Sequence, residues 1–246
     1  MRRSRNPAAE PVFLTLAAIF IAALVACNLL FRKFFIWEIP VLGHFGLNPS
    51  MELSVGILAY PVTFICTDLL SEFWGRKRVS QLVTAGFFAS MFVVVLVLVG
   101  TVVPAVDWSV VDDATFDMVF GVQAVVVAAS MGAYLGAQYL DIRLFHFWKR
   151  KTGGRHLWLR NNASTFTSQL VDTILVNSLL SVLGAGEVTP ERLPVLILNG
   201  VAFKWIVAIC DTPLIYAAVW FIRDRLGVAP HQPAPLRTRR PASASG

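Results

Sequence analysis

The sequence contains few charged residues: Asp, Glu, Lys and Arg make up only 15% of its 246 residues, whereas apolar residues make up 56%. Its mean hydropathy is +0.65. A soluble domain of this composition would expose large apolar patches and aggregate. The composition therefore excludes an ordinary soluble globular protein and predicts a membrane protein.

Cysteine and the common catalytic motifs are also scarce. The three cysteines are isolated and show no metal-ligand spacing. No G-x-S-x-G or H-E-x-x-H pattern occurs, and all four histidines fall in predicted loops or in the C-terminal tail. No Walker A pattern occurs either, so any ATP would be hydrolysed by a partner protein. We therefore expect a protein that is not an enzyme and that has neither a metal site nor a cofactor.

Six apolar stretches each approach the roughly 20 residues that cross a bilayer as a helix. The sequence thus predicts an all-α integral membrane protein with six transmembrane helices. The stretches are Pro11–Phe31, Leu53–Leu70, Gln81–Val103, Phe116–Leu140, Asn162–Leu183 and Leu193–Ile222.

The basic residues indicate the orientation of these helices, because Lys and Arg concentrate on the cytoplasmic side. With the N-terminus inside, 17 of the 21 basic residues fall in inner segments, while the outer segment Pro104–Asp117 is acidic. We therefore expect a multi-pass protein of the bacterial plasma membrane with both termini in the cytoplasm. The basic pI of 9.6 then reflects topology and contact with anionic lipids, and we expect no nucleic-acid partner.

The chain is expected to form one membrane domain, residues 11–226, between a cytoplasmic segment, 1–10, and a disordered cytoplasmic tail, 227–246, rich in Pro, Ala, Ser and Arg. The outer segment Phe34–Leu47 could form a short hairpin at the membrane surface. Stripes of small residues on the first and fourth stretches permit close packing, either within one subunit or against a partner. They contain Ala18, Ala22 and Ala26, and Gly132, Ala133, Gly136 and Ala137.

Two opposite charges lie at matching depth inside apolar stretches, Asp172 in the fifth and Lys204 in the sixth. A charge in hydrocarbon costs at least about 2.5 kcal/mol, so such residues indicate function first. At about 1.5 Å per residue both lie near the midplane, where an ion pair is plausible. Thr165, Ser168 and Gln169 share a helix face with Asp172 and lead to it from the inner end. A pair that only locks two helices together is the alternative, but the polar stripe favours a substrate site.

The sixth stretch surrounds its lysine with space and with a broken helix. Gly200, Ala208 and Asp211 share a face with Lys204, and the two small residues leave room beside it. Pro213 lacks an amide hydrogen and therefore frees a carbonyl next to Asp211. Broken helices near ionisable groups are a common way in which transporters build binding sites.

The second stretch carries a similar combination. Pro61 is expected to open the helix in mid-membrane, because it removes an amide donor. Asp68 and Glu72 project together one turn apart, which suits the handling of a proton or of a cationic ligand. For Glu72 the alternative is an ion pair with Arg76, four residues further on.

Three blocks carry a family resemblance over roughly residues 28–225. The first is Gly56, Tyr60-Pro61, Thr63, Asp68, Glu72 and Gly75-Arg76-Lys77-Arg78; the others are Ser168-Gln169 with Asp172-Thr173, and Lys204 with Thr212-Pro213 and Tyr216. Together they resemble the queuosine precursor transporters, also called the vitamin uptake transporter family. The resemblance implies a six-helix importer of 7-deazaguanine bases, the 7-cyano and 7-aminomethyl precursors of the tRNA base queuosine. It also implies a fold akin to the substrate-binding components of energy-coupling-factor transporters.

The implied substrate fits the polar residues. A guanine-like edge offers parallel N–H donors that Asp172 or Asp68 could accept, and a carbonyl to which Lys204 or Gln169 could donate. Aromatic rings could stack on the base. The predicted substrate-binding residues are Tyr60, Asp68, Gln169, Asp172, Lys204, Asp211 and Tyr216, with Phe64 as a further stacking candidate and Glu72, Pro61 and Pro213 in coupling or gating.

One alternative within transport stays open. The chain could be the substrate-binding subunit of an energy-coupling-factor transporter for another small nucleobase-like or vitamin-like compound. The expected partners are therefore the substrate, the lipid bilayer, and either a second copy of the chain or an energising subunit.

Overall fold

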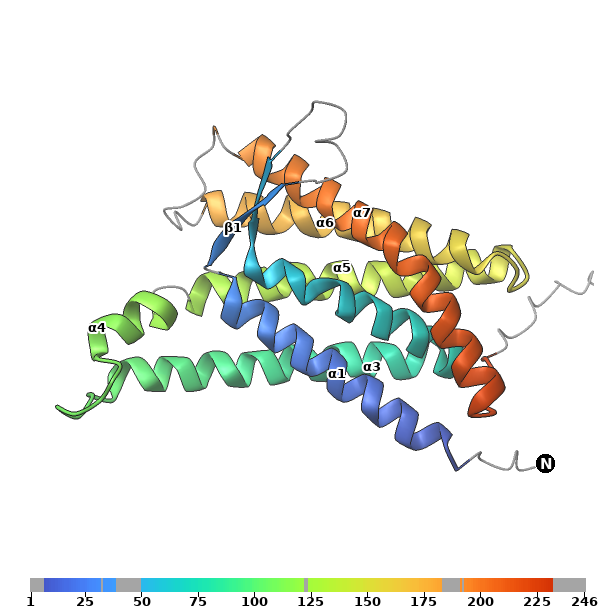
Figure 1. Ribbon diagram of the computed structural model, residues 1–246, viewed down its shortest axis with the longest axis horizontal. Coiled ribbons are helices and arrows are strands. Elements are labelled where there is room, and N and C mark those ends of the chain that lie inside the picture. The colour runs from blue at the N-terminus through green and yellow to red at the C-terminus, as the bar shows by residue number, and fades with distance from the viewer. Residues whose placement is uncertain are drawn as a thin grey trace, which may run out of the picture.

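The computed structural model describes residues 7–31, 33–38, 50–121, 124–182, 191 and 193–231, and helices dominate it (Figure 1). The long helices lie side by side, and a small β-hairpin covers one end. In chain order the elements are α1 (Ala9–Leu30), β1 (Phe34–Glu38), β2 (Ser50–Ser54), the 3-10 helix η1 (Val55–Leu58), α3 (Tyr60–Val102), α4 (Asp113–Phe116), the π-helix η2 (Asp117–Gly121), α5 (Ala124–Lys151), α6 (Leu157–Val182), α7 (Leu193–Trp220) and the π-helix η3 (Phe221–Arg225).

Helix α3 is a hairpin of two arms, residues 60–74 and 76–102, which run in opposite directions (Figure 1). The reversal occurs at Gly75, whose φ of 78° and ψ of 169° suit glycine alone. The first arm is only about 22 Å long at 1.5 Å per residue, shorter than the hydrocarbon core. The sequence prediction placed the start of this helix at Leu53, but Leu53 lies in β2 and the helix begins at Tyr60.

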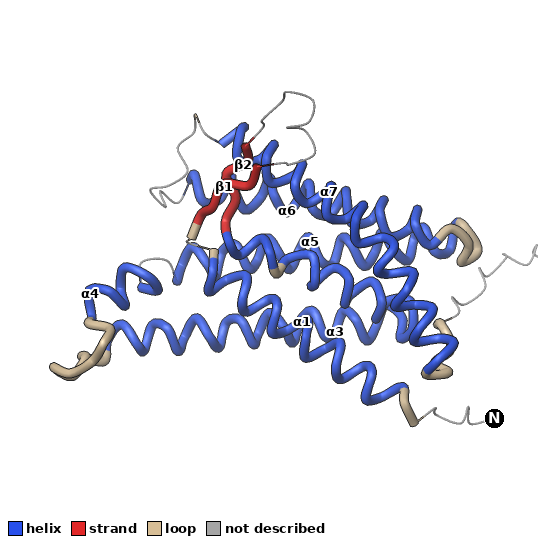
Figure 2. The backbone as a smooth tube through the Cα atoms, in the orientation of Figure 1, coloured by secondary structure: helices blue, strands red, loops and turns tan. Residues whose placement is uncertain are grey.

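The predicted surface hairpin is present, although its second strand lies further along the chain. β1 and β2 pair antiparallel, with Ile36 opposite Glu52 (Figure 2). Trp37 packs edge-on against Phe203 of α7, with ring centroids 5.1 Å apart. Residues 39–49, which include the end of the predicted segment, lie outside the described residues. The hairpin therefore packs on the region of α7 that carries Lys204.

The helices pack around α5, which contacts both α3 and α6, while α1 packs on α3 and α7 packs on α6. An apolar core joins α1, α3 and α5 and includes Phe20, Leu24, Leu70 and Met131. On the side of α6 the buried side chains are largely polar. The bundle therefore has an apolar half and a polar half, and the polar half contains the predicted site.

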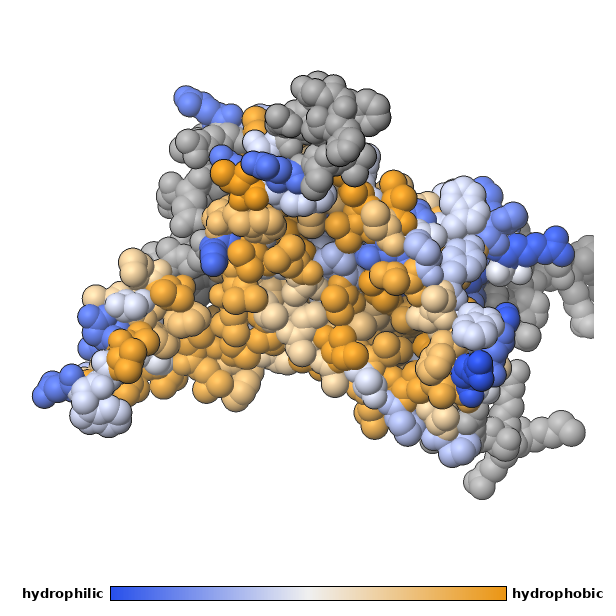
Figure 3. Space-filling model, viewed as in Figure 1, coloured by the Kyte–Doolittle hydropathy of each residue, from blue (hydrophilic) through white to orange (hydrophobic). Residues whose placement is uncertain are grey.

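The outer surface is apolar, as a bilayer requires. Large side chains such as Phe88, Val99, Leu198 and Trp220 face outward, and an apolar band separates hydrophilic ends in Figure 3. Three described runs, Ala9–Leu30, Val55–Val102 and Leu193–Arg225, are long and apolar enough to cross a membrane. The chain is therefore an all-α membrane protein. The count of six spans stays a prediction, in which the bend at Gly75 divides the second run into two.

The segments predicted to be cytoplasmic lie together. The start of α1, the bend at Gly75, the α5–α6 turn and the end of α7 share one end of the bundle, opposite the hairpin and α4 (Figure 1). Which end faces the cytoplasm stays a prediction based on the basic residues.

The predicted disordered tail begins with an ordered segment. Val228 is buried against Phe73 and Ile222, and the amide of His231 donates to the carbonyl of Glu72 at 2.7 Å. The His231 ring also packs against Gly75, where an added Cβ would lie 2.7 Å from the ring. Composition alone missed this contact, because only one apolar side chain anchors it. Residues 232–246 lie outside the described residues.

Candidate functional site

The site is centred on the ion pair between Asp172 of α6 and Lys204 of α7. The Lys204 Nζ lies 2.8 Å from Oδ2 of Asp172 and 3.1 Å from the hydroxyl of Thr173. Both charged residues are buried, with 3% and 9% of their surface exposed. Gly200 packs against Thr173 at a distance that leaves little space for a side chain, so the two helices approach closely here. The room that was predicted at Gly200 is therefore taken up by helix packing. The two residues are thus in contact, as expected from their depth.

Tyr60 completes this cluster, because it lies at the start of the first arm of α3. Its hydroxyl donates to Oδ2 of Asp172 at 2.5 Å, and its ring lies 4.0 Å from the Lys204 Nζ in a cation–π contact. The ring also touches Phe64 and Tyr134. The other carboxylate oxygen of Asp172, Oδ1, has no hydrogen-bond partner among the described residues. One oxygen of this buried carboxylate therefore stays free.

Pro61 has a different role from the predicted one. It occupies the first turn of α3, directly after η1, where its missing amide hydrogen is not needed. It therefore does not open a helix in mid-membrane but fixes where α3 begins, next to Tyr60. Gly56 of η1 lies so close to α1 that an added Cβ would be 2.4 Å from the carbonyl oxygen of Cys27.

The predicted polar stripe on α6 is buried along its whole length and leads to Asp172. Thr165, Ser168 and Gln169 are each at most 3% exposed, and Asn161 extends the stripe by one further turn. The stripe faces α5, the helix that α6 contacts most extensively. A continuous polar column therefore connects the inner end of the bundle with the ion pair.

Sequence reasoning missed the residues of α5 that face this stripe. Asp141 is 1% exposed, and its Oδ1 accepts a hydrogen bond from Ser168 at 3.0 Å. Gln138, one turn earlier, is fully buried and donates to Tyr134. Asp68 of α3 lies near enough to Asp141 for the two carboxylates to interact electrostatically. The available signal was the spacing of Gln138 and Asp141, three residues apart on one helix face.

Glu72 does not pair with Arg76, which was the alternative considered from the sequence. Its Oε2 lies 2.7 Å from the Nζ of Lys149 and 2.6 Å from a guanidinium nitrogen of Arg160, and both pairs are buried. The sequence could not reveal these partners, because they lie 77 and 88 residues further along the chain. The cluster ties α3, α5 and α6 together near the bend at Gly75.

The predicted site residues in the inner half of α7 lie apart from the ion pair of Asp172 and Lys204. Tyr216 is 44% exposed and its hydroxyl accepts from the amide of Trp158 at the start of α6, so it is not next to the ion pair. Pro213 lies inside α7 as expected, but it is exposed, and Asp211 is half-buried. Thr212 exchanges hydrogen bonds with Asn162 of α6. These residues therefore lie toward the inner end, one or more turns from Lys204.

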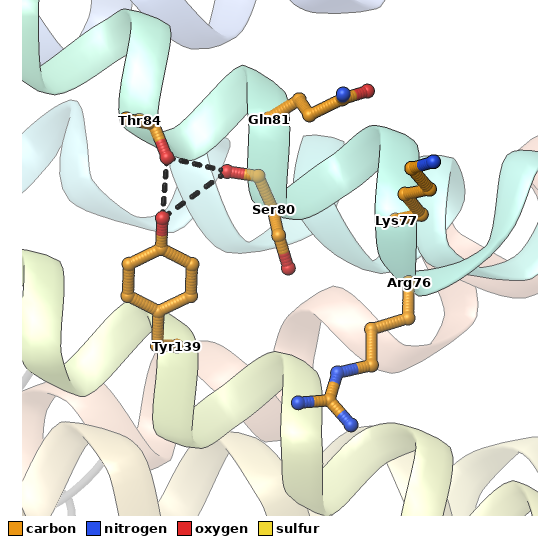
Figure 4. A pocket seen from close by; sticks show the side chains of 6 residues that line it. All are labelled: Arg76, Lys77, Ser80, Gln81, Thr84 and Tyr139. Atoms are coloured by element: carbon orange, nitrogen blue, oxygen red, sulfur yellow. Dashed lines mark hydrogen bonds between the residues drawn. The ribbon is translucent and has the colours of Figure 1, made fainter.

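A surface pocket lies apart from all the predicted substrate-binding residues. It is lined by one face of the second arm of α3 together with Tyr139 of α5 (Figure 4). The Tyr139 hydroxyl meets Thr84, whose own hydroxyl donates to the Ser80 carbonyl at 2.9 Å. Arg76 and Lys77 occupy its other end, near the bend.

Buried charges inside an apolar helical bundle are typical of membrane transporters. Residues 54–218, more than half of the chain, match the family described as "Putative vitamin uptake transporter". The chain therefore belongs to this transporter family.

A curated relative gives a more specific likeness. The "Probable queuosine precursor transporter" of Bacillus subtilis (strain 168) is 30% identical over 132 residues, which cover 53% of this chain and 56% of that protein. The chain thus spans about half the length of the curated relative it matches. No solved structure matches the chain, and the expected likeness to energy-coupling-factor components stays a prediction.

Proposed function

We propose that the protein imports queuosine precursors, the 7-cyano and 7-aminomethyl forms of 7-deazaguanine, across the bacterial plasma membrane. Family membership and the printed name of the relative support this substrate class. In this proposal the six predicted spans enclose the polar column, and the base binds at the cluster of Tyr60, Asp172 and Lys204.

The observation that carries the proposal is the arrangement of hydrogen-bonding groups around Asp172. Tyr60 and Lys204 both use Oδ2, which leaves Oδ1 to accept an N–H group from the edge of a guanine-like base. Lys204 has three hydrogens and makes two hydrogen bonds here, to Asp172 and Thr173, so it can donate the third to the carbonyl of the base. The ring of Tyr60 holds the Lys204 ammonium in place by a cation–π contact. A carboxylate, an ammonium and a ring in one cluster suit this ligand.

A second candidate is a substrate-binding subunit that works with an ATPase. Ala18 and Ala22 of α1 are exposed, so the small-residue stripe on α1 is not used for packing within this chain. Such a stripe can accept a helix of a partner. Copurification of an ATPase subunit with the tagged protein from its own membranes supports this candidate, whereas uptake by the chain alone in vesicles contradicts it.

Binding by the purified protein tests the proposed function. We expect 7-cyano-7-deazaguanine to bind the wild type and raise its melting temperature, whereas guanine, which lacks the 7-substituent, binds less tightly. Tyr60→Phe keeps the ring but loses one hydrogen bond to a charged group. We therefore expect the binding free energy to weaken by no more than the roughly 1.5 to 3 kcal/mol of such a bond. Arg78→Met, at an exposed ion pair with Glu10, is the matched control and should bind normally. No binding of either deazaguanine by a folded protein would contradict the proposal.

A further inference from the structure

Among the described residues, the buried side chains include one more acidic group than basic groups. Two of its acidic groups have cationic partners: Glu72 and Asp172 form the ion pairs described above. Burial of an ion without a balancing charge is strongly unfavourable. Among the described residues, the buried carboxylates are Asp68, Glu72, Asp141 and Asp172, and the buried Lys and Arg side chains are Lys149, Arg160 and Lys204.

Histidine does not supply the missing charge. His146, the buried histidine of the described residues, lies beyond the predicted fourth span at the basic end of α5. Burial, together with the nearby charge of Lys149, lowers the pKa of His146 to about 4. It is therefore neutral at physiological pH, and the imbalance of one charge persists.

The unbalanced charge lies at Asp68 and Asp141. Neither residue forms an ion pair within the described part of the chain, although Arg160 of α6 acts on Asp68 from a distance while it holds Glu72. The other charged groups that act electrostatically on Asp68 are the carboxylates of Asp141 on α5, Glu72 on its own helix and Asp211 on α7. Asp141 faces the hydroxyl groups of the α6 stripe.

The surrounding polar groups point to a ligand that accepts electron pairs. Both oxygens of Asp68 and Oδ2 of Asp141 lack hydrogen-bond partners among the described residues. The same is true of three neutral oxygens nearby on α5 and α6, at Gln138, Thr165 and Gln169, and all three residues are at most 3% exposed. One amide hydrogen of Gln138 is donated to Tyr134, and its side-chain oxygen has no partner among the described residues. Unpaired carboxylate, amide and hydroxyl oxygens on these helices suit a small cation, because each of them can be a ligand atom.

The cluster of Asp68 and Asp141 forms the middle one of three layers of charged residues along the bundle. Asp68 is about 12 Å along α3 from Tyr60, and Ser168, the partner of Asp141, is one turn of about 5.4 Å from Asp172. On the other side, Glu72 follows Asp68 by one turn and holds Lys149 and Arg160 at the inner end. A cation in the middle layer would therefore sit between the proposed substrate site and the ion pairs that close the bundle.

We propose that Asp68 and Asp141 together bind one monovalent cation, a proton or Na⁺, that is transported with the substrate. This inference rests on the proposed function and extends it to the energy source. The cation enters from the outside and neutralises the middle layer. It leaves to the cytoplasm when the ion pairs of Glu72 separate. Gln138, Thr165 and Gln169 provide the neutral oxygens around it.

The first test detects the cation directly and does not depend on transport. The full-length protein in lipid is studied at neutral pH in choline chloride. If the cation is a proton, infrared spectra show the carbonyl stretch of a protonated carboxylic acid; if it is Na⁺, NaCl raises the melting temperature more than choline chloride does. Either effect should vanish in Asp141→Asn and persist in Asp107→Asn, an exposed aspartate of the α3–α4 loop. Absence of both effects, or their persistence in a folded Asp141→Asn, would overturn the proposal.

The second test measures coupling in vesicles that contain the purified protein, with 7-cyano-7-deazaguanine as the probe and the membrane potential clamped. A tenfold inward gradient of the coupling cation, which is one pH unit for protons, should drive about tenfold accumulation at one cation per substrate. The separate proton and Na⁺ gradients identify the ion. In Asp141→Asn, and more weakly in Ser168→Ala, the ratio of uptake with and without the gradient should fall toward one. A wild type that exchanges the base across the membrane but ignores both gradients contradicts the coupling site alone, whereas failure of exchange contradicts the proposed function.

Discussion

Removal of the Asp172–Lys204 pair, one side at a time and then together, separates a substrate site from a structural lock. Lys204→Met leaves the Asp172 carboxylate with only the hydroxyl of Tyr60, and Asp172→Asn leaves the ammonium with Thr173 and the face of the Tyr60 ring. Because each change leaves a buried charge unpaired, each should cost about 3 to 5 kcal/mol. For a chain of this size that corresponds to a fall in melting temperature of roughly 6 to 20 °C.

The double variant Asp172→Asn with Lys204→Met removes both charges and should recover most of this stability. Melting temperatures in detergent and binding of 7-cyano-7-deazaguanine are measured on all four proteins. We expect the double variant to be stable and yet not to bind the base, since the charged acceptor at Asp172 and the free hydrogen of Lys204 are both lost. The matched control is the exposed pair Glu10–Arg78, whose two side chains lie 2.8 Å apart and should show a coupling energy of about 1 kcal/mol or less. Normal binding by the double variant would refute the site and leave the pair as a helix lock.

Three further predictions concern the inner end of the bundle and the topology. Gly75→Ala forces a side chain into a backbone with φ of 78° and against the ring of His231, so it should lower the melting temperature more than His231→Ala does; equal effects would contradict the strained bend. The pKa of His146 falls from 6.5 to about 4 on folding, so the unfolded state binds more protons than the folded state between these pH values. The free energy of unfolding should therefore rise by up to about 3 kcal/mol from pH 4 to pH 6.5. A thermal-shift series should show this slope in the wild type and not in His146→Gln; the same slope in both proteins would contradict the burial of His146. In a cysteine-free background, Asp107→Cys should react with an impermeant thiol reagent from outside and Lys151→Cys should not, and the reverse pattern would invert the predicted topology.

The sequence predicted the parts of the site that lie within one helix. The depth of Asp172 and Lys204 follows from counting residues along apolar stretches, and the burial of Thr165, Ser168 and Gln169 follows from the helical period. These signals are local, so a single sequence contains them.

The features that the sequence did not predict correctly depend on tertiary contacts. The partners of Glu72 come from α5 and α6, far along the chain, whereas the sequence offered only the nearby Arg76. Asp141 follows the predicted fourth span and precedes a basic segment, a position typical of an ordinary residue at the membrane–water interface. Its contact with Ser168 depends on the packing of α6 against α5. Pro61 was expected inside a helix, because the 3-10 turn before Tyr60 gives no periodic signal of its own.

The most direct test of the account is uptake in bacterial cells that cannot make queuosine and lack their own transporter for its precursors. The cells receive 7-cyano-7-deazaguanine at low concentration, and queuosine in their tRNA is measured. We expect the wild-type chain to restore queuosine. The double variant Asp172→Asn with Lys204→Met, present in the membrane in equal amount, should not. Restoration by the double variant, or no restoration by a wild-type chain that has reached the membrane, would contradict the central claim.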